Sequence, residues 1–375
     1  MNPICATRLH AADATATVMS NTAFVTDWSR RYFGPWWHAF EVPAAGVCAG
    51  PVVIADVDPG TYAHLATQVS GGPHEDTVYA KAPMKVATDE QGTVRAVAPG
   101  QELAYVSQPS TGRLTIVGLK AEPVALAAAR LARDTMRGQL LRSGWTLLHA
   151  SAVARDGHTV LTFGTKGSGK TTTALALAGL GWELLANDRV FIRADNGRLK
   201  VLPWPAAAAI GLGLLDALDW FDVARKKLQA GERLHPTQHS DVTEALLAGH
   251  REPLWEPNGK RERKAQVFPD QFASWFGLTL ATGGLAKALL FPKIRPQATP
   301  AVVDEPRALG DGDFMSGATE DRYPDVFGLR RIDGGGSDEA RATVAKQLAG
   351  LTQHSVVLGH DLPANAAFLD RLLTA

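Results

Sequence analysis

The feature that most constrains this chain is a glycine-rich segment, GTKGSGKT, at residues 164–171. It matches the pattern G-x-x-x-x-G-K-[ST], in which backbone N–H groups converge on phosphate oxygens. The apolar run TVLTF enters the segment, and the run TTALALAGLG leaves it without an internal proline. A strand, a loop and a helix are therefore predicted in that order. A glycine turn beside a solvated lysine is the alternative interpretation.

The residue types in this segment predict individual roles. Glycine admits phosphate without obstruction by a Cβ, and the helix N-terminus adds the positive end of its dipole. We expect Lys170 to reach the β and γ phosphates of ATP and the Thr171 hydroxyl to bind Mg²⁺. The predicted nucleotide-binding residues are Gly164, Thr165, Lys166, Gly167, Ser168, Gly169, Lys170, Thr171 and Thr172.

An acidic residue, Asp188, follows Lys170 by eighteen positions within the apolar run WELLANDRVFI. A short helix and a return are expected to bring this run alongside the strand that enters the loop. The carboxylate would then face the phosphates, where it can hold Mg²⁺ or accept a proton from an attacking hydroxyl. A surface aspartate at a strand end is the alternative.

Composition argues against several other classes of protein. The chain has 375 residues, with 38 Lys and Arg against 38 Asp and Glu, so no net charge draws it to nucleic acid or an acidic membrane. Its two cysteines, Cys5 and Cys48, form no CxxC pair and are expected to be free thiols. The first twenty residues lack the pattern of a signal peptide. We expect a cytoplasmic protein without a nucleic-acid partner, a membrane partner or a structural metal.

The fold is predicted to be α/β with two domains. Residues 1–120 show short apolar runs separated by turns, as in DEQG at 89–92, and are expected to be mainly β. The aromatic cluster RYFGPWWHAF at 31–40 is expected in the core or at a domain boundary, with a ligand platform as the alternative. Residues 121–375 are predicted to form the nucleotide-binding domain, beginning with a helix at 123–143 and carrying added helices toward the C-terminus.

Later segments support weaker predictions. The run WELLANDRVFIRADNGRLKVLPW is expected to be one strand, a tight turn at 195–197 and a returning strand. Helices are expected at 206–221 and 271–291, and near the C-terminus a helix, the strand HSVVLGH and a last helix. The segment 318–329 is expected to be a packed corner. The basic run at 259–264 is expected to be solvated. The alternative is that it forms a flap over the triphosphate or over an anionic acceptor. Lys293 and Arg295 are weaker candidates for such a flap.

The segment LLHASAV…VLTFGTKGSGKTTTALALAGLGWELLANDRVFI resembles the core of the HPr kinase/phosphorylase family, over about residues 145–203. That family shows a histidine-containing strand, a second strand, the phosphate loop, a short helix and an Asp-Asp strand at this spacing. The resemblance implies a P-loop core of the HPr kinase/PEP carboxykinase type. It places His149 on the active-site histidine and Asn187 with Asp188 on the Asp-Asp pair, which divides the metal and general-base roles.

The sequence departs from that family in two ways. Asn187 cannot take a proton, so Asp188 carries both roles, another residue supplies the base, or phosphotransfer is lost. Because phosphoryl transfer depends mostly on positioning and charge neutralisation, an asparagine that orients the acceptor hydroxyl is compatible with a kinase. The family's Pro-Gly-Arg-Asn-type segment is absent, which argues against HPr as the substrate. The chain is more similar to HPr kinase-related proteins found beside biosynthetic clusters.

Together these features predict an ATP- and Mg²⁺-dependent kinase acting on a hydroxyl of a small molecule or peptide. Its predicted catalytic residues are Asp188, His149, Asn187 and Lys170, and its predicted metal ligands are Thr171 and Asp188. A nucleotide-binding regulatory or scaffolding protein is one alternative, and an ATPase that drives a partner is another. The family resemblance also implies a homo-oligomer.

Overall fold

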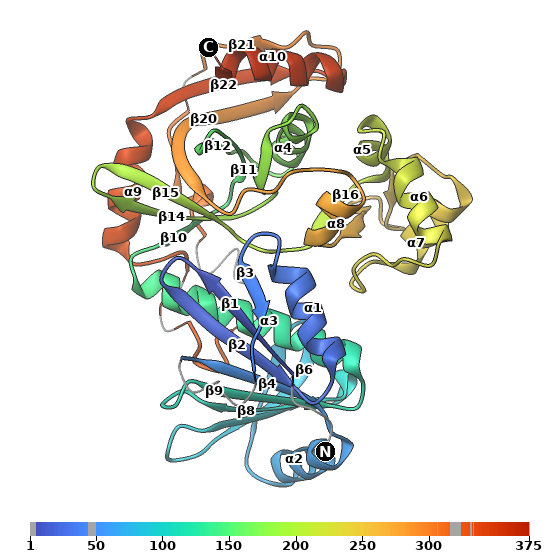
Figure 1. Ribbon diagram of the computed structural model, residues 1–375, viewed down its shortest axis with the longest axis vertical. Helices are drawn as coiled ribbons and strands as arrows, with labels where there is room; N and C mark the ends of the chain where they lie inside the picture. Colours follow the sequence, from blue (N-terminus) through green and yellow to red (C-terminus); the bar gives the residue numbers. More distant parts are fainter. Residues whose placement is uncertain are drawn as a thin grey trace. The chain divides into compact units, whose positions relative to one another are not determined.

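The computed structural model describes residues 5–43, 50–305, 307–315, 324–330, 332 and 334–374. The chain divides into two compact units, residues 1–146 with 315–338 and residues 147–314 with 339–375 (Figure 1). Cys48 and residues 318–323 of the expected corner at 318–329 lie outside the described residues.

The first unit contains a mixed sheet in which nine described strands lie in the order β3-β1-β2-β4-β9-β8-β7-β6-β5. Its strands are β1 (Cys5–Ala11), β2 (Ala14–Ser20), β3 (His38–Glu41), β4 (Val52–Val57), β5 (Glu75–Tyr79), β6 (Ala82–Thr88), β7 (Val94–Ala98), β8 (Leu103–Gln108) and β9 (Arg113–Gly118). Its helices are α1 (Ala23–Phe33), α2 (Pro59–Gly71) and α3 (Ala121–Arg142). The mainly β character expected for residues 1–120 is therefore observed, and the DEQG turn joins β6 to β7 through a hydrogen bond from Gly92 N to Asp89 O.

Helix α3 packs on β2, β4 and β9 and so belongs to the first unit. The boundary between the units follows Thr146 and not residue 120, because the long apolar face of this helix covers the first sheet. The aromatic cluster at 31–40 contributes to the core of the same unit. Trp36 and Trp37 are each 1% exposed, and the Phe33 ring stacks on Trp37. This burial supports the core interpretation over a ligand platform.

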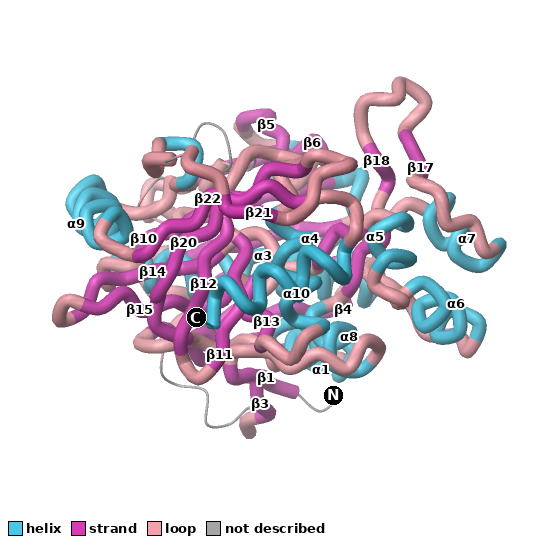
Figure 2. Tube along the Cα trace, turned by 90° about the horizontal axis from the view of Figure 1, so that it is seen from above, coloured by secondary structure: helices cyan, strands magenta, loops and turns pink. Residues whose placement is uncertain are grey.

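The second unit contains another mixed sheet, in which described strands follow the order β10-β14-β15-β20-β12-β11-β13 and β22 also pairs with β20. Its strands are β10 (Thr146–Leu148), β11 (Ser151–Arg155), β12 (His158–Thr162), β13 (Glu183–Ala186), β14 (Val190–Asp195), β15 (Arg198–Pro203), β16 (Ala208–Ile210), β17 (Leu254–Trp255), β18 (Glu262–Arg263), β19 (Ala265–Val267), β20 (Gly284–Ile294), β21 (Ala301–Val302) and β22 (Thr352–Leu358). Its helices are α4 (Lys170–Gly179), α5 (Leu212–Ala217), α6 (Phe221–Gln229), α7 (Ser240–Ala248), α8 (Pro269–Ser274), α9 (Asp338–Ala349) and α10 (Leu362–Thr374). Figure 2 shows α4 and α10 lying side by side over this sheet.

Strand β20 organises the second sheet and corrects one expectation. The run at 284–291 was expected to be helical, yet it pairs in parallel with β12 on one edge and with β22 on the other. A short apolar run fits either a buried strand or a helix, so the two parallel partners decide its conformation. The expected helix at 206–221 is likewise divided, because Ala208–Ile210 forms β16 and two short helices follow.

The segment around Asp188 also differs from expectation. It forms two strands, β13 and β14, which lie in different parts of the sheet. Strand β13 pairs with β11 and not with β12, so one strand separates it from the strand that enters the glycine-rich loop. The tight turn expected at 195–197 is present, with Asn196 and Gly197 at φ of 49° and 76°, as a two-residue hairpin requires. The helix, strand and last helix expected near the C-terminus correspond to α9, β22 and α10.

Candidate functional site

The glycine-rich loop connects β12 to α4, as the sequence predicts. Gly164, Gly167 and Gly169 all have positive φ, at 152°, 84° and 100°. A Cβ on Gly169 would lie 2.8 Å from Ile294 Cδ1, the tip of a side chain at the end of β20, so that side chain would have to move. Glycine is favoured here mainly by the positive φ.

Lys170 is the first residue of α4, and only 8% of it is exposed. Its ammonium folds back over the loop, with Nζ 2.6 Å from Gly164 O and 3.2 Å from Thr165 O. The Ser151 hydroxyl donates to Lys170 O at 2.8 Å and so ties the first turn of α4 to β11. The lysine charge is thus held at the mouth of the loop by the sheet beneath it.

Asp188 lies just after β13 and contacts two basic side chains. His149 Nε2 is 3.2 Å from Oδ1, and Arg189 Nε is 3.4 Å from Oδ2. Burial acts to raise the pKa of Asp188, but the hydrogen bond from His149 and the charges of Arg189 and Lys170 outweigh burial and lower that pKa. Because 43% of its side chain remains exposed, Asp188 presents an ionised carboxylate to solvent.

A contact between Thr171 and Asn187 joins the helix to the acidic segment. The Thr171 hydroxyl donates to Asn187 O at 3.3 Å. Asn187 is only 7% exposed, and this contact uses its backbone carbonyl. The first turn of α4 and the Asp188 carboxylate therefore lie at the same end of the sheet, although β11 lies between β12 and β13 in the strand order.

His149 is held by a segment that sequence reasoning did not single out. Its backbone N–H donates to Asp313 O at 2.9 Å. The Asp313 side chain is nearly buried, and its carboxylate accepts hydrogen bonds from Arg307 Nη2 at 2.7 Å and Gly310 N at 3.0 Å. Arg189 could have been found from its place beside Asp188. Arg307 and Asp313 follow the motif by more than a hundred positions and carry no local signal.

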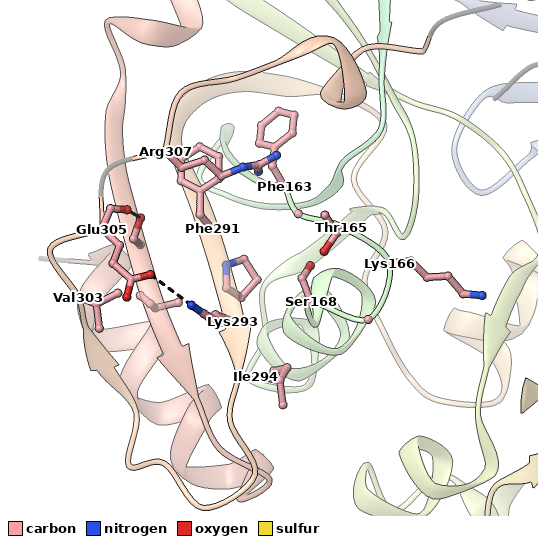
Figure 3. A pocket seen from close by; sticks show the side chains of 15 residues that line it. Phe163, Thr165, Lys166, Ser168, Phe291, Lys293, Ile294, Val303, Glu305 and Arg307 are labelled. Carbon is pink, nitrogen blue, oxygen red and sulfur yellow. Dashed lines mark hydrogen bonds and ion pairs between the residues drawn. The ribbon is translucent and has the colours of Figure 1, made fainter. Parts of the chain in front are cut away.

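A cleft of about 410 Å³ opens beside the glycine-rich loop. Figure 3 shows the loop on one side and the end of β20 with the chain after β21 on the other. Lys293 lines this cleft and lies 3.5 Å from Glu305, and Arg295 lies 3.9 Å from the same carboxylate. The Lys166 side chain points away from the cleft (Figure 3). Of the two weaker basic candidates, the structure therefore places Lys293 beside the loop.

The basic run at 259–264 forms the β17–β18 hairpin and its tip, which Figure 2 shows extending from the region of α6 and α7. Arg263 pairs with Asp241, and Lys264 lies 3.4 Å from Glu262. The neighbouring Arg251 contacts Asp216 and Asp222. Local carboxylates thus compensate much of the positive charge, which supports a solvated face and not a flap over phosphate.

The described residues contain neither a metal-ligand cluster nor a membrane-spanning helix. No three His, Cys, Asp or Glu side chains gather there in a way that could hold a metal ion. No helix among those residues is both long enough and apolar enough to cross a membrane.

No family model matches the sequence, and no curated protein matches it either. Among solved structures, the chain is similar to the Hpr(Ser) kinase/phosphatase from Coxiella burnetii. That match covers 61% of this chain and 92% of the other, with 12% sequence identity and a TM-score of 0.26. At this TM-score the likeness carries no argument about the site, so function rests on the residues and geometry of this chain.

Proposed function

We propose that the second unit is an ATP- and Mg²⁺-dependent kinase that transfers the γ-phosphoryl group to a hydroxyl of a small molecule or peptide. The observation that carries this proposal is that Lys170, Thr171 and Asp188 lie close together at one end of the sheet. A cationic loop next to an ionised carboxylate suits a magnesium-bound polyphosphate, since phosphoryl transfer is promoted mainly by positioning and charge neutralisation.

The loop fits a phosphate group. Ser168 Oγ is buried and has no hydrogen-bond partner among the described residues, so it is a donor that a phosphate oxygen would satisfy. Residues 164–172 would hold the phosphates through their backbone N–H groups and the Lys170 ammonium. Thr171 and Asp188 would provide protein ligands to Mg²⁺, which usually takes its other ligands from phosphate and water. The bound ion would supply charge neutralisation at the transferred group.

The lowered pKa of Asp188 favours a charged role for this residue. A carboxylate that stays ionised binds a cation well but is a weak proton acceptor near neutral pH. His149 and Arg189 orient this carboxylate through its two oxygens. Asn187 contributes by anchoring Thr171 through its backbone, which is a positioning role that does not need a second carboxylate.

The test uses labelled ATP with candidate hydroxyl acceptors. Lys170→Ala and Asp188→Ala are each expected to reduce transfer by about 10²-fold or more, because each removes charge from the site. Lys200→Ala and Asp195→Ala are the matched controls, since these residues form an ion pair at the β14–β15 turn, outside the site. Transfer that continues at the wild-type rate in both site variants would exclude the proposed chemistry.

The amide of Asn187 favours a second candidate function, a regulatory module that binds ATP without transfer, because an amide cannot accept a proton from a hydroxyl. Asn187→Asp separates the two functions. If the amide is a defect, the aspartate variant should gain transfer activity; if the amide belongs to a working site, the aspartate variant should lose activity. Calorimetry that shows magnesium–ATP binding, together with no transfer in either protein, would favour the regulatory module.

A further inference from the structure

The cleft beside the glycine-rich loop contains more than a phosphate site. The glycine-rich loop lines one side of it, and apolar and polar side chains of other segments line the other side (Figure 3). The apolar members include Pro292, Ile294, Val303 and Val356, which come from β20, the chain after β21, and β22. These apolar side chains would not bind a polyphosphate, because they offer it neither hydrogen bonds nor charge.

The polar members of the far wall include a carboxylate. Glu305 lines the cleft, and its side chain is 55% exposed. An isolated carboxylate beside a phosphate loop would repel the anion. Here Lys293 approaches Oε2 at 3.5 Å and Arg295 approaches Oε1 at 3.9 Å, so nearby cations compensate the negative charge.

The position of Glu305 is fixed through its backbone. The Ser355 hydroxyl on β22 donates to Glu305 O at 2.5 Å. The two ion pairs of the side chain are long and solvent-exposed, and pairs of this kind contribute little free energy. A ligand hydroxyl can therefore displace them at low cost. An exposed carboxylate on an anchored backbone is well suited to accept hydrogen bonds from a vicinal diol, as acidic side chains do for ribose in dinucleotide sites.

We propose that this cleft is the nucleoside half of the donor site, in which the apolar wall covers the base and Glu305 accepts hydrogen bonds from the ribose hydroxyls. The volume of about 410 Å³ lies within the range usual for small-molecule sites. This inference rests on the proposed function, because it places the nucleoside on the cleft side of the phosphate loop. It makes the donor a ribonucleoside triphosphate and distinguishes it from an inorganic polyphosphate.

Calorimetry with three probes tests the assignment: magnesium–ATP, magnesium–2′,3′-dideoxyATP and magnesium–tripolyphosphate. The wild-type protein is expected to bind ATP about tenfold or more tightly than either other probe, because one or two hydrogen bonds to a charged group are lost with dideoxyATP. Glu305→Ala should bind ATP and dideoxyATP equally. Asp304→Ala is the matched control, since this exposed neighbouring carboxylate does not line the cleft and should preserve the preference.

Filling the cleft provides a second measurement. Ser355→Trp and Val303→Trp should each lower ATP affinity toward that of tripolyphosphate, with tripolyphosphate binding unchanged. If either tryptophan variant fails to fold, Glu305→Ala still decides, because its side chain lies at the surface. Wild-type protein that binds ATP and tripolyphosphate equally would overturn the nucleoside assignment alone. Wild-type protein that binds none of the three probes would overturn the proposed function itself.

Discussion

Replacing Gly164 with alanine is the sharpest test of how the glycine-rich loop is built. At φ of 152°, Gly164 occupies backbone space that side chains rarely adopt, which costs a residue with a Cβ about 1–3 kcal/mol. The added Cβ would also lie 2.8 Å from Ser168 Cβ and still closer to its hydroxyl. Rotating Ser168 cannot relieve contact with its own Cβ, so the backbone must shift, at a further cost of about 1–3 kcal/mol. The expected destabilisation is about 2–6 kcal/mol.

Gly167 supplies the matched control within the same loop. Its φ of 84° is also positive, but a Cβ there would meet nothing within 4 Å. Gly167→Ala should therefore cost only the left-handed backbone penalty of about 1–2 kcal/mol. Thermal unfolding measures the global difference, and hydrogen exchange of peptides spanning β12 and α4 measures the local one.

A double-mutant cycle with Ser168→Gly isolates the steric part of the Gly164→Ala effect. Removing the Ser168 side chain should recover about 1–3 kcal/mol in the Gly164→Ala background, because only the backbone penalty remains. If Gly164→Ala and Gly167→Ala destabilise the protein equally, or if Ser168→Gly recovers nothing, the close packing inferred for this loop is wrong.

Three further predictions concern the second unit. His149→Leu should raise the pKa of Asp188, seen by NMR titration, because a hydrogen bond that favours the ionised form is lost. Since the folded pKa of Asp188 is lowered, its ionised form stabilises the fold above the unfolded carboxyl pKa, and this contribution is lost as pH falls through the folded pKa. His149→Leu should reduce that acid-dependent loss in denaturation experiments. Thr171→Val should weaken ATP binding about tenfold when Mg²⁺ is present, measured by calorimetry. Arg155→Ala should lower stability by about 1–2 kcal/mol in urea unfolding, because Arg155 stacks on Trp182 at 4.4 Å and pairs with a carboxylate of α10.

Each of these predictions has a control and an outcome that contradicts it. His158→Leu replaces an exposed histidine at the β11–β12 turn and should leave the Asp188 titration unchanged; an equal shift in both variants would contradict the contact. For Thr171→Val, binding without Mg²⁺ should match the wild type, and an equal loss in both conditions would argue against a metal role. Arg198→Ala removes an exposed arginine at the start of β15, and a comparable loss of stability there would contradict the role of Arg155.

Local signals were strong around the glycine-rich loop. The strand, loop and helix at residues 158–179 follow from the glycine pattern and from the composition of its flanks, because backbone conformation and helix propensity are local properties. The same holds for the hairpin turn at 195–197 and for α3. The segment at 284–294 shows where local information fails, since its apolar run becomes a strand only through pairing with β12 and β22.

The sequence by itself determined that a phosphate-binding pattern heads a helix and that an acidic residue follows soon after it. Tertiary structure alone decided that β11 lies between β12, which enters the glycine-rich loop, and β13, which precedes Asp188. It also decided that Asp313 anchors His149 and that Glu305 lines a cleft beside the loop. The physical reason is that side-chain types and short-range spacing fix local conformation. Contacts between segments more than a hundred residues apart depend on strand order and packing, which no local pattern records.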